Sequence, residues 1–171
     1  MKGESRILPQ EAKKNSVFTY AASSYVDDPV NQKILVELQQ EPRLTMTELG
    51  RRIGMSAPAV AERVRRLEEN GVITGYRLGL APAQLGLPLG VYIRVRPNPG
   101  QLSHLIDIAQ QTPEIVECHR ITGEDCLLIK AFLPSIDQLD RLLDKFLRFG
   151  MTTTSIIQSS PVPLRDLPVG E

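Results

Sequence analysis

Five arginines lie between positions 47 and 66, and only two carboxylates, Glu48 and Glu62, lie among them. Five positive charges against two negative ones leave a local excess of three. A guanidinium group binds phosphates, and it can pair with the O6 and N7 atoms of guanine in the DNA major groove. The cluster therefore indicates a contact surface for double-stranded DNA, although the whole chain has 20 basic and 20 acidic residues and no net charge.

The residues around these arginines have the spacing of a helix-turn-helix. A short helix is expected to begin at Thr45 or Thr47, whose hydroxyl can cap it, and Gly54 permits the left-handed turn that ends it. Ser56 is expected to cap a second helix directly after this turn. Gly50 has no side chain, so it allows the two helices to cross closely, as a helix-turn-helix requires.

The second of these helices is predicted to bury one side and present the other to DNA. Val60, Val64 and Leu67 form its apolar stripe at helical spacing. Small residues at its start permit close approach to base edges, and the arginines are expected to reach bases or phosphates. The predicted DNA-binding residues are Thr45, Thr47, Arg51, Arg52, Ser56, Ala57, Ala59, Glu62, Arg63 and Arg66. The alternative is an ordinary three-helix bundle whose arginines form a solvated face.

The elements before and after this pair complete a predicted N-terminal domain over residues 26–75. Asp27 and Asp28 ahead of Pro29 indicate the start of a first helix, which Pro42 ends. Residues 72–78 have the composition of a strand. The segment before the domain, residues 1–25, shows no firm period and is expected to be a flexible arm.

The second half of the chain predicts a βαββαβ order over residues 89–160. Alternating apolar positions indicate a strand from Leu89, and further strands are expected over 115–121, 126–133 and 152–159. Helical apolar stripes lie between the first and second and between the third and fourth. This order is typical of a ferredoxin-like fold, so the chain is predicted to be α+β. Residues 76–88 are expected to form a linker strand and loop, and residues 161–171 an irregular tail.

Other kinds of site receive little support from the sequence. Two histidines and two cysteines have no recognised metal-ligand spacing, and the chain has no glycine-rich phosphate loop and no nucleophile–base set. We therefore expect no catalytic residue, no metal and no cofactor. No apolar run is long enough to span a membrane, and the two cysteines without an export signal fit free thiols in the cytoplasm.

Several segments of the two predicted domains follow a pattern that is shared within one protein family. They are Asp28-x2-Asn31-x2-Ile34-Leu35, the run from Thr47 to Ser56, Val60-x2-Arg63-Val64-x2-Leu67-Glu68-Glu69-x-Gly71-Val72-Ile73, Gly75-Tyr76, Val116-Glu117-Cys118 and Thr122-Gly123. The run through Gly71, Val72 and Ile73 to Tyr76 is the most specific of them. Through these segments, residues 26–159 resemble the Lrp/AsnC (leucine-responsive, or feast/famine) regulators.

The resemblance implies a sequence-specific transcriptional regulator in two parts. An N-terminal helix-turn-helix domain, winged-helix-like in class, would bind DNA, and Arg63 falls on the family's arginine in the recognition helix. A C-terminal ferredoxin-like domain would form dimers and higher oligomers such as an octamer, and would bind a small effector, usually an amino acid. The effector would lie at the turn of Gly123, Glu124 and Asp125, where backbone N–H groups suit a carboxylate and the acidic side chains suit an ammonium. A plain hairpin turn is the alternative there.

Two rival functions share this architecture. One is an enzyme that resembles the haem-biosynthesis decarboxylases and acts on a carboxylated tetrapyrrole. It would need catalytic histidines and a basic pocket, whereas this chain has two histidines and its arginines cluster in the helix-turn-helix. The other is a sensor that has lost DNA binding and acts by protein contact.

Overall fold

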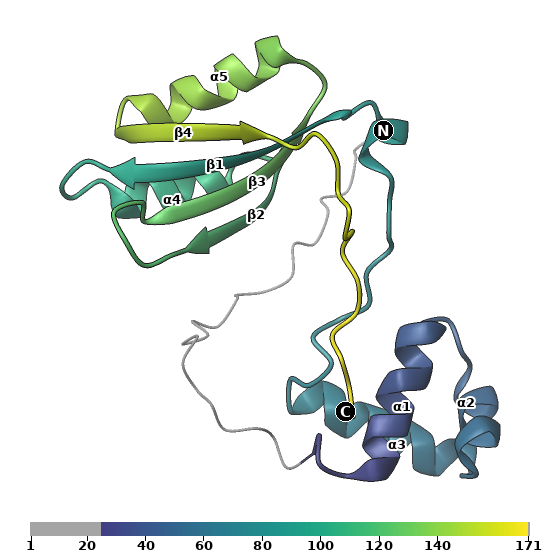
Figure 1. Cartoon of the computed structure of the whole chain (residues 1–171). Helices are drawn as coiled ribbons and strands as arrows, with labels where there is room; N and C mark the ends of the chain where they lie inside the picture. The colour runs from purple at the N-terminus through teal and green to yellow at the C-terminus, as the bar shows by residue number, and fades with distance from the viewer. Residues whose placement is uncertain (1–24, 171) are drawn as a thin grey trace, which may run out of the picture. The chain divides into compact units, whose positions relative to one another are not determined.

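A computed structural model of the protein describes residues 25–170, so the predicted arm lies almost wholly outside the described residues (Figure 1). The chain divides into two compact units. The helical unit takes the described residues up to Arg77 together with those from Asp166 onward. The second unit runs from Leu78 to Arg165 and contains the sheet.

Three helices make up the helical unit: α1 (Pro29–Gln40), α2 (Met46–Ile53) and α3 (Ala57–Glu69). Asp28 caps α1, because its carboxylate accepts hydrogen bonds from the backbone of Val30 at 2.8 Å and Asn31 at 3.4 Å. Thr45 caps α2 in the same way, accepting from the backbone N–H of Glu48 at 3.2 Å. The expected helix starts are therefore confirmed at both places.

The core of the helical unit consists of apolar side chains from all three helices. Ile34 of α1, Leu49 of α2, and Val60 and Leu67 of α3 are fully buried. Burial of such side chains contributes roughly 1.5–3 kcal/mol each to folding. The apolar stripe predicted for α3 is thus confirmed, and it fixes which side of this helix remains exposed.

Residues 72–78 do not form a strand, so this prediction is wrong. Gly71 adopts a left-handed conformation with φ of 70°, and the backbone N–H groups of Val72 and Ile73 both donate to the carbonyl of Leu67, at 2.9 and 3.1 Å. These donors therefore close the end of α3 and are unavailable for a strand ladder. The segment after them contains a short 3-10 helix, Pro82–Leu85, instead of the expected strand and loop alone.

The second unit holds a four-stranded antiparallel sheet with the order β2-β3-β1-β4. Its elements follow the chain as βαββαβ, which confirms the ferredoxin-like prediction. They are β1 (Leu89–Pro97), α4 (Leu102–Gln110), β2 (Ile115–Arg120), β3 (Leu127–Leu133), α5 (Ile136–Leu147) and β4 (Gly150–Ile156).

The last strand is displaced from its predicted range of 152–159. It begins at Gly150, which pairs with Pro97 of β1, and a Cβ at this position would lie 2.5 Å from the carbonyl oxygen of Arg96. It ends at Ile156, which pairs with Val91 of β1, and the backbone N–H of Ile157 still donates to the carbonyl of Gly90 at 2.9 Å.

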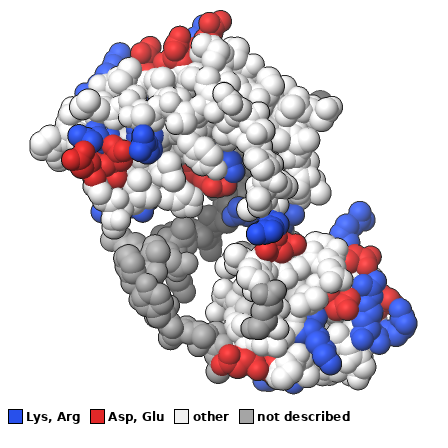
Figure 2. Space-filling view, in the orientation of Figure 1, with Lys and Arg blue, Asp and Glu red and all other residues white. Residues whose placement is uncertain are grey.

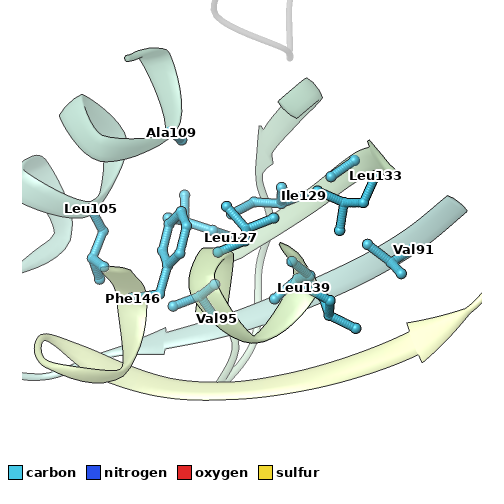
Figure 3. Close-up of a cluster of buried hydrophobic side chains, with 12 residues drawn as sticks. Val91, Val95, Leu105, Ala109, Leu127, Ile129, Leu133, Leu139 and Phe146 are labelled. Carbon is cyan, nitrogen blue, oxygen red and sulfur yellow. The ribbon is translucent and has the colours of Figure 1, made fainter. Parts of the chain in front are cut away.

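Both helices of the second unit cover the same face of the sheet. The side chains of this core alternate along β1 and β3, and Figure 3 shows Phe146 of α5 among Leu105, Leu127 and Val95. Phe146 is fully buried. The opposite face is not covered by any described element of the second unit, and it presents the intervening side chains of β1 and β3.

The C-terminal tail is irregular, as expected, but its last residues belong to the helical unit. The side-chain amide of Gln39 on α1 donates to the backbone carbonyl of Leu167 at 2.9 Å. This return of the chain was not predicted from the sequence pattern. No helix among residues 25–170 is long and apolar enough to cross a membrane.

Candidate nucleic-acid interface

The turn between α2 and α3 has the geometry that the spacing predicts. Gly54 ends α2 with φ of 75°, in the left-handed region. The backbone of Met55 then donates to the carbonyl of Gly50 at 2.8 Å. A Cβ on Gly50 would lie only 2.6 Å from the carbonyl oxygen of Met55. The absence of a side chain at Gly50 therefore lets the turn fold directly onto α2.

The exposed side of this helix pair carries most of the predicted contact residues. The side chain of Arg51 is 74% exposed and that of Arg66 is 59% exposed. Figure 2 shows Lys and Arg gathered over the side of the helical unit where Figure 1 places α2. Thr47 and Ser56 are also exposed, whereas Ala57 and Ala59 are half-buried at the start of α3. Ser56 stands at the N-cap position of α3, but its hydroxyl makes no capping hydrogen bond.

Carboxylates on the same surface pair with these arginines. Arg51 bonds Glu48 at 2.7 Å, one turn away on α2. Arg66 and Arg65 both bond Glu62, at 2.9 and 2.7 Å. Exposed pairs of this kind contribute about 0–1 kcal/mol each, so a DNA phosphate can displace them at little cost.

Arg52 is held more firmly than its neighbours. Its guanidinium bonds Glu37 at 3.0 Å and Glu41 at 2.6 Å on α1, and Glu48 at 3.2 Å on α2. Three carboxylates around one arginine connect α1 to α2. Arg52 was predicted to contact DNA, and local spacing does not reveal these partners because two of them lie 11 and 15 residues away.

The arginines lower the pKa of Glu48 from its ordinary 4.5 to about 2, chiefly through hydrogen bonds from Arg51 and then Arg52. A carboxyl with a depressed pKa stabilises the folded state fully above its unfolded pKa, and this contribution is lost as the pH falls through the folded value. Glu48→Gln should therefore lower the Tm at pH 7, and the difference from the wild type should close between pH 4.5 and 2. Thermal unfolding across this range checks the prediction. The control is Asp140→Asn, which removes an exposed carboxylate of α5. A Tm difference between Glu48→Gln and the wild type that does not change with pH would contradict the prediction.

Arg63 differs from the other arginines of α3. Its Nη1 donates to the Asp28 carboxylate at 2.7 Å and to the Asn31 side-chain oxygen at 2.8 Å. Its side chain is only 32% exposed. The structure therefore places the guanidinium of this predicted DNA contact against the start of α1.

The turn between β2 and β3 is the predicted effector site. Gly123 has φ of 115°, and the backbone of Ile121 donates to the carbonyl of Cys126 at 3.0 Å to close the hairpin. The carboxylate of Glu124 bonds Arg96, and that of Asp125 lies 3.8 Å from the Nε of Arg94. The structure thus brings the two acidic residues together with two arginines of β1.

Sequence reasoning missed Arg94 and Arg96 as members of this cluster. Their outward position was readable, because both alternate with the buried residues of β1. Their nearness to the turn depends on the pairing of β1 with β3, which places Arg94 opposite Leu128. Among residues 25–170, no group of three histidine, cysteine or acidic side chains gathers as a metal site.

Known proteins share both units. The sequence profile for winged helix-turn-helix DNA-binding matches residues 27–74, and the profile for the Lrp/AsnC ligand binding domain matches residues 90–167. The chain is 37% identical over 133 residues to the uncharacterized HTH-type transcriptional regulator YezC of Bacillus subtilis, covering 78% of this chain and 94% of that protein.

Two solved structures extend the likeness to the fold. The structure of Bacillus subtilis LrpC has a TM-score of 0.74 and 33% identity, and covers 77% of this chain and 94% of that chain. A transcriptional regulator from Neisseria meningitidis in complex with L-methionine has a TM-score of 0.74 and 28% identity, covering 82% and 96%. The chain therefore belongs to the Lrp/AsnC family of DNA-binding transcriptional regulators.

Proposed function

We propose that α3 enters the DNA major groove, where Arg66 contacts base edges while Arg51 and the start of α2 contact phosphates. The observation that carries the proposal is the exposed side of α3, which lies opposite the buried stripe of Val60, Val64 and Leu67. Phosphate contacts set register and affinity, and base contacts set sequence preference. The two arginines therefore take different parts in binding.

Salt-dependent DNA binding tests this division. With a random-sequence duplex, Arg51→Ala should weaken binding and reduce the slope of log affinity against log salt by about 1, because one phosphate contact is lost. Arg66→Ala should cost about 1–3 kcal/mol on a preferred site and less on random duplex. Arg141→Ala, an exposed arginine of α5, is the control. Equal binding by Arg51→Ala, Arg66→Ala and the wild type would contradict the proposal.

The protein acts, in this proposal, as a homodimer joined through the uncovered face of its sheet. That face combines the aromatic side chain of Tyr92 with the half-buried Leu128 and Phe132 of β3. A two-fold axis through such a face would pair the recognition helices and favour pseudo-palindromic operators. Light scattering should give at least twice the chain mass at micromolar concentration, and a stable monomer would oppose the assignment.

An amino-acid effector is proposed at the turn of Gly123, Glu124 and Asp125. The acidic pair can take the ammonium, and Arg94 and Arg96 beside it can take the carboxylate. The L-methionine complex of the Neisseria meningitidis regulator supports this class of ligand.

A thermal-shift screen of the twenty amino acids tests the effector. A ligand at 100 times its Kd should stabilise the native protein by about 2.7 kcal/mol, and Asp125→Asn should reduce the shift. Asp137→Asn on α5 serves as the matched control. The effector proposal fails if none of the twenty raises the Tm, or if Asp125→Asn leaves the shift unchanged.

A further inference from the structure

Arg63 joins α3 to the start of α1 through two acceptors. The first is the Asp28 carboxylate at 2.7 Å and the second is the side-chain oxygen of Asn31 at 2.8 Å. Asn31 is only 5% exposed, and its amide donates in turn to the backbone carbonyl of Tyr25 at 3.0 Å. The bridge therefore ends on a buried side chain that is itself hydrogen-bonded.

The Asp28 carboxylate performs two tasks at once. Its Oδ1 caps α1 by accepting from the backbone of Val30, and its Oδ2 accepts from Arg63. The bond from Arg63 is the main reason that the pKa of Asp28 lies below its usual value. One ionised group thus fixes the first turn of α1 and the side of α3 that faces it.

The other arginines of α3 have no comparable partner among the residues that the structure describes. Arg65 and Arg66 pair with carboxylates three or four residues away on the same helix, so these bonds cannot orient α3 against the rest of the unit. The bond from Arg63 to Asp28 spans 35 residues and connects two helices. Apolar burial alone is non-directional, whereas a charge-assisted hydrogen bond has a preferred direction.

We infer that Arg63 is a positioning residue, which sets the rotation of α3 through Asp28 and Asn31 and so directs Arg66 toward the DNA. Arg63 and Arg66 are neighbours at helical spacing, so fixing the first also fixes the direction of the second. The inference rests on the proposed major-groove contact of α3. It replaces the sequence-based assignment of Arg63 to a direct DNA contact.

Asp28→Asn is the most informative variant. Asparagine caps a helix about as well as aspartate, so this change keeps the cap and removes the charge that holds Arg63. Simple electrostatics predicts tighter DNA binding after loss of a negative charge. A positioning role predicts the opposite on a preferred site, with an affinity about tenfold lower and an unchanged salt slope.

A double-mutant cycle completes the test, with Arg63→Gln, Asp28→Asn, both together and Arg63→Lys as the conservative variant. The probes are the duplex that the wild type selects from a random pool and an unselected duplex. We expect the double variant to lose no more DNA affinity than either single variant, because each single change already breaks the same bond between Arg63 and Asp28. Arg63→Lys, which can still pair with Asp28, should recover part of the loss. Far-UV circular dichroism serves as the control that each variant keeps its helices. If Arg63→Gln unfolds, Arg63→Lys and Asp28→Asn still test the inference.

Three results would decide against the inference. If Arg63→Gln reduces the salt slope by about 1 while Asp28→Asn binds as the wild type does, Arg63 contacts DNA directly and only the positioning role fails. If the two losses add in the double variant, the residues act separately. If the wild type binds neither duplex, the proposed function fails, and the positioning role fails with it.

Discussion

Replacing Gly50 with leucine is expected to force α2 away from α3 and abolish DNA binding while the second unit stays folded. A Cβ at Gly50 would meet the carbonyl oxygen of Met55 at 2.6 Å and the backbone nitrogen of Ala57 at 3.4 Å. These are backbone atoms, so no side-chain rotation relieves the overlap. Overpacking typically costs 1–3 kcal/mol, and a rigid backbone obstacle puts this change at about 3 kcal/mol or more.

Peptide-resolved hydrogen exchange checks this result in the full chain. Peptides from α2 and α3 should lose protection in Gly50→Leu, and those from β1 and β3 should keep it. Gly79→Leu is the matched control, because a Cβ at Gly79 meets nothing within 4 Å and its φ is not positive. Wild-type DNA affinity in Gly50→Leu would show that the close crossing at this turn is not required.

Replacing Phe146 with alanine should produce the largest loss of stability in the second unit. The ring is fully buried between the sheet and its helices (Figure 3). Phenylalanine-to-alanine changes at such sites cost about 3–5 kcal/mol, because apolar contact is lost and a cavity remains.

The neighbouring residue provides the control for this prediction. Leu147 is 52% exposed on the same helix, so Leu147→Ala should change stability by much less. Denaturant unfolding followed by exchange of peptides from β1 and β3 separates this unit from the helical one. Similar midpoints for Phe146→Ala and Leu147→Ala would mean that the core does not depend on the ring.

Local patterns predicted much of the fold. Gly54 marked the turn because only a residue without Cβ adopts φ of 75° freely, and Thr45 marked a helix start through its hydroxyl. Alternation along β1 separated the buried Val91 and Ile93 from the outward Arg94. These features depend on a residue and its immediate neighbours, so spacing alone carries them.

Features set by distant partners were not predictable in this way. Arg52 has the same exposed spacing as Arg51, but the fold places Glu37 and Glu41 of α1, 15 and 11 residues away, against its guanidinium. Arg63 looked like its neighbours on α3 until the fold placed Asp28 beside it. In each case the sequence identified the chemical group, and the tertiary structure decided its partner.

Two kinds of arginine occur within the one basic cluster. Arg52 and Arg63 bond carboxylates on α1 and at its N-cap, whereas within residues 25–170 Arg51 and Arg66 bond carboxylates on their own helices alone. The second pair can exchange these partners for phosphates or bases without disturbing the packing of the helices. A modest local charge excess can therefore serve DNA binding in a chain with no net charge.

Selection of duplexes from a random pool by the whole protein is the decisive experiment on whether α3 determines the DNA sequence preference. We expect an enriched pseudo-palindrome whose half-sites lie about one helical turn apart, roughly 10 base pairs. Arg66→Ala should lose its base preference at one position in each half-site and keep the spacing between the half-sites. Failure to enrich any sequence, or an unchanged motif with Arg66→Ala, would contradict the proposal that Arg66 of α3 contacts base edges in the major groove.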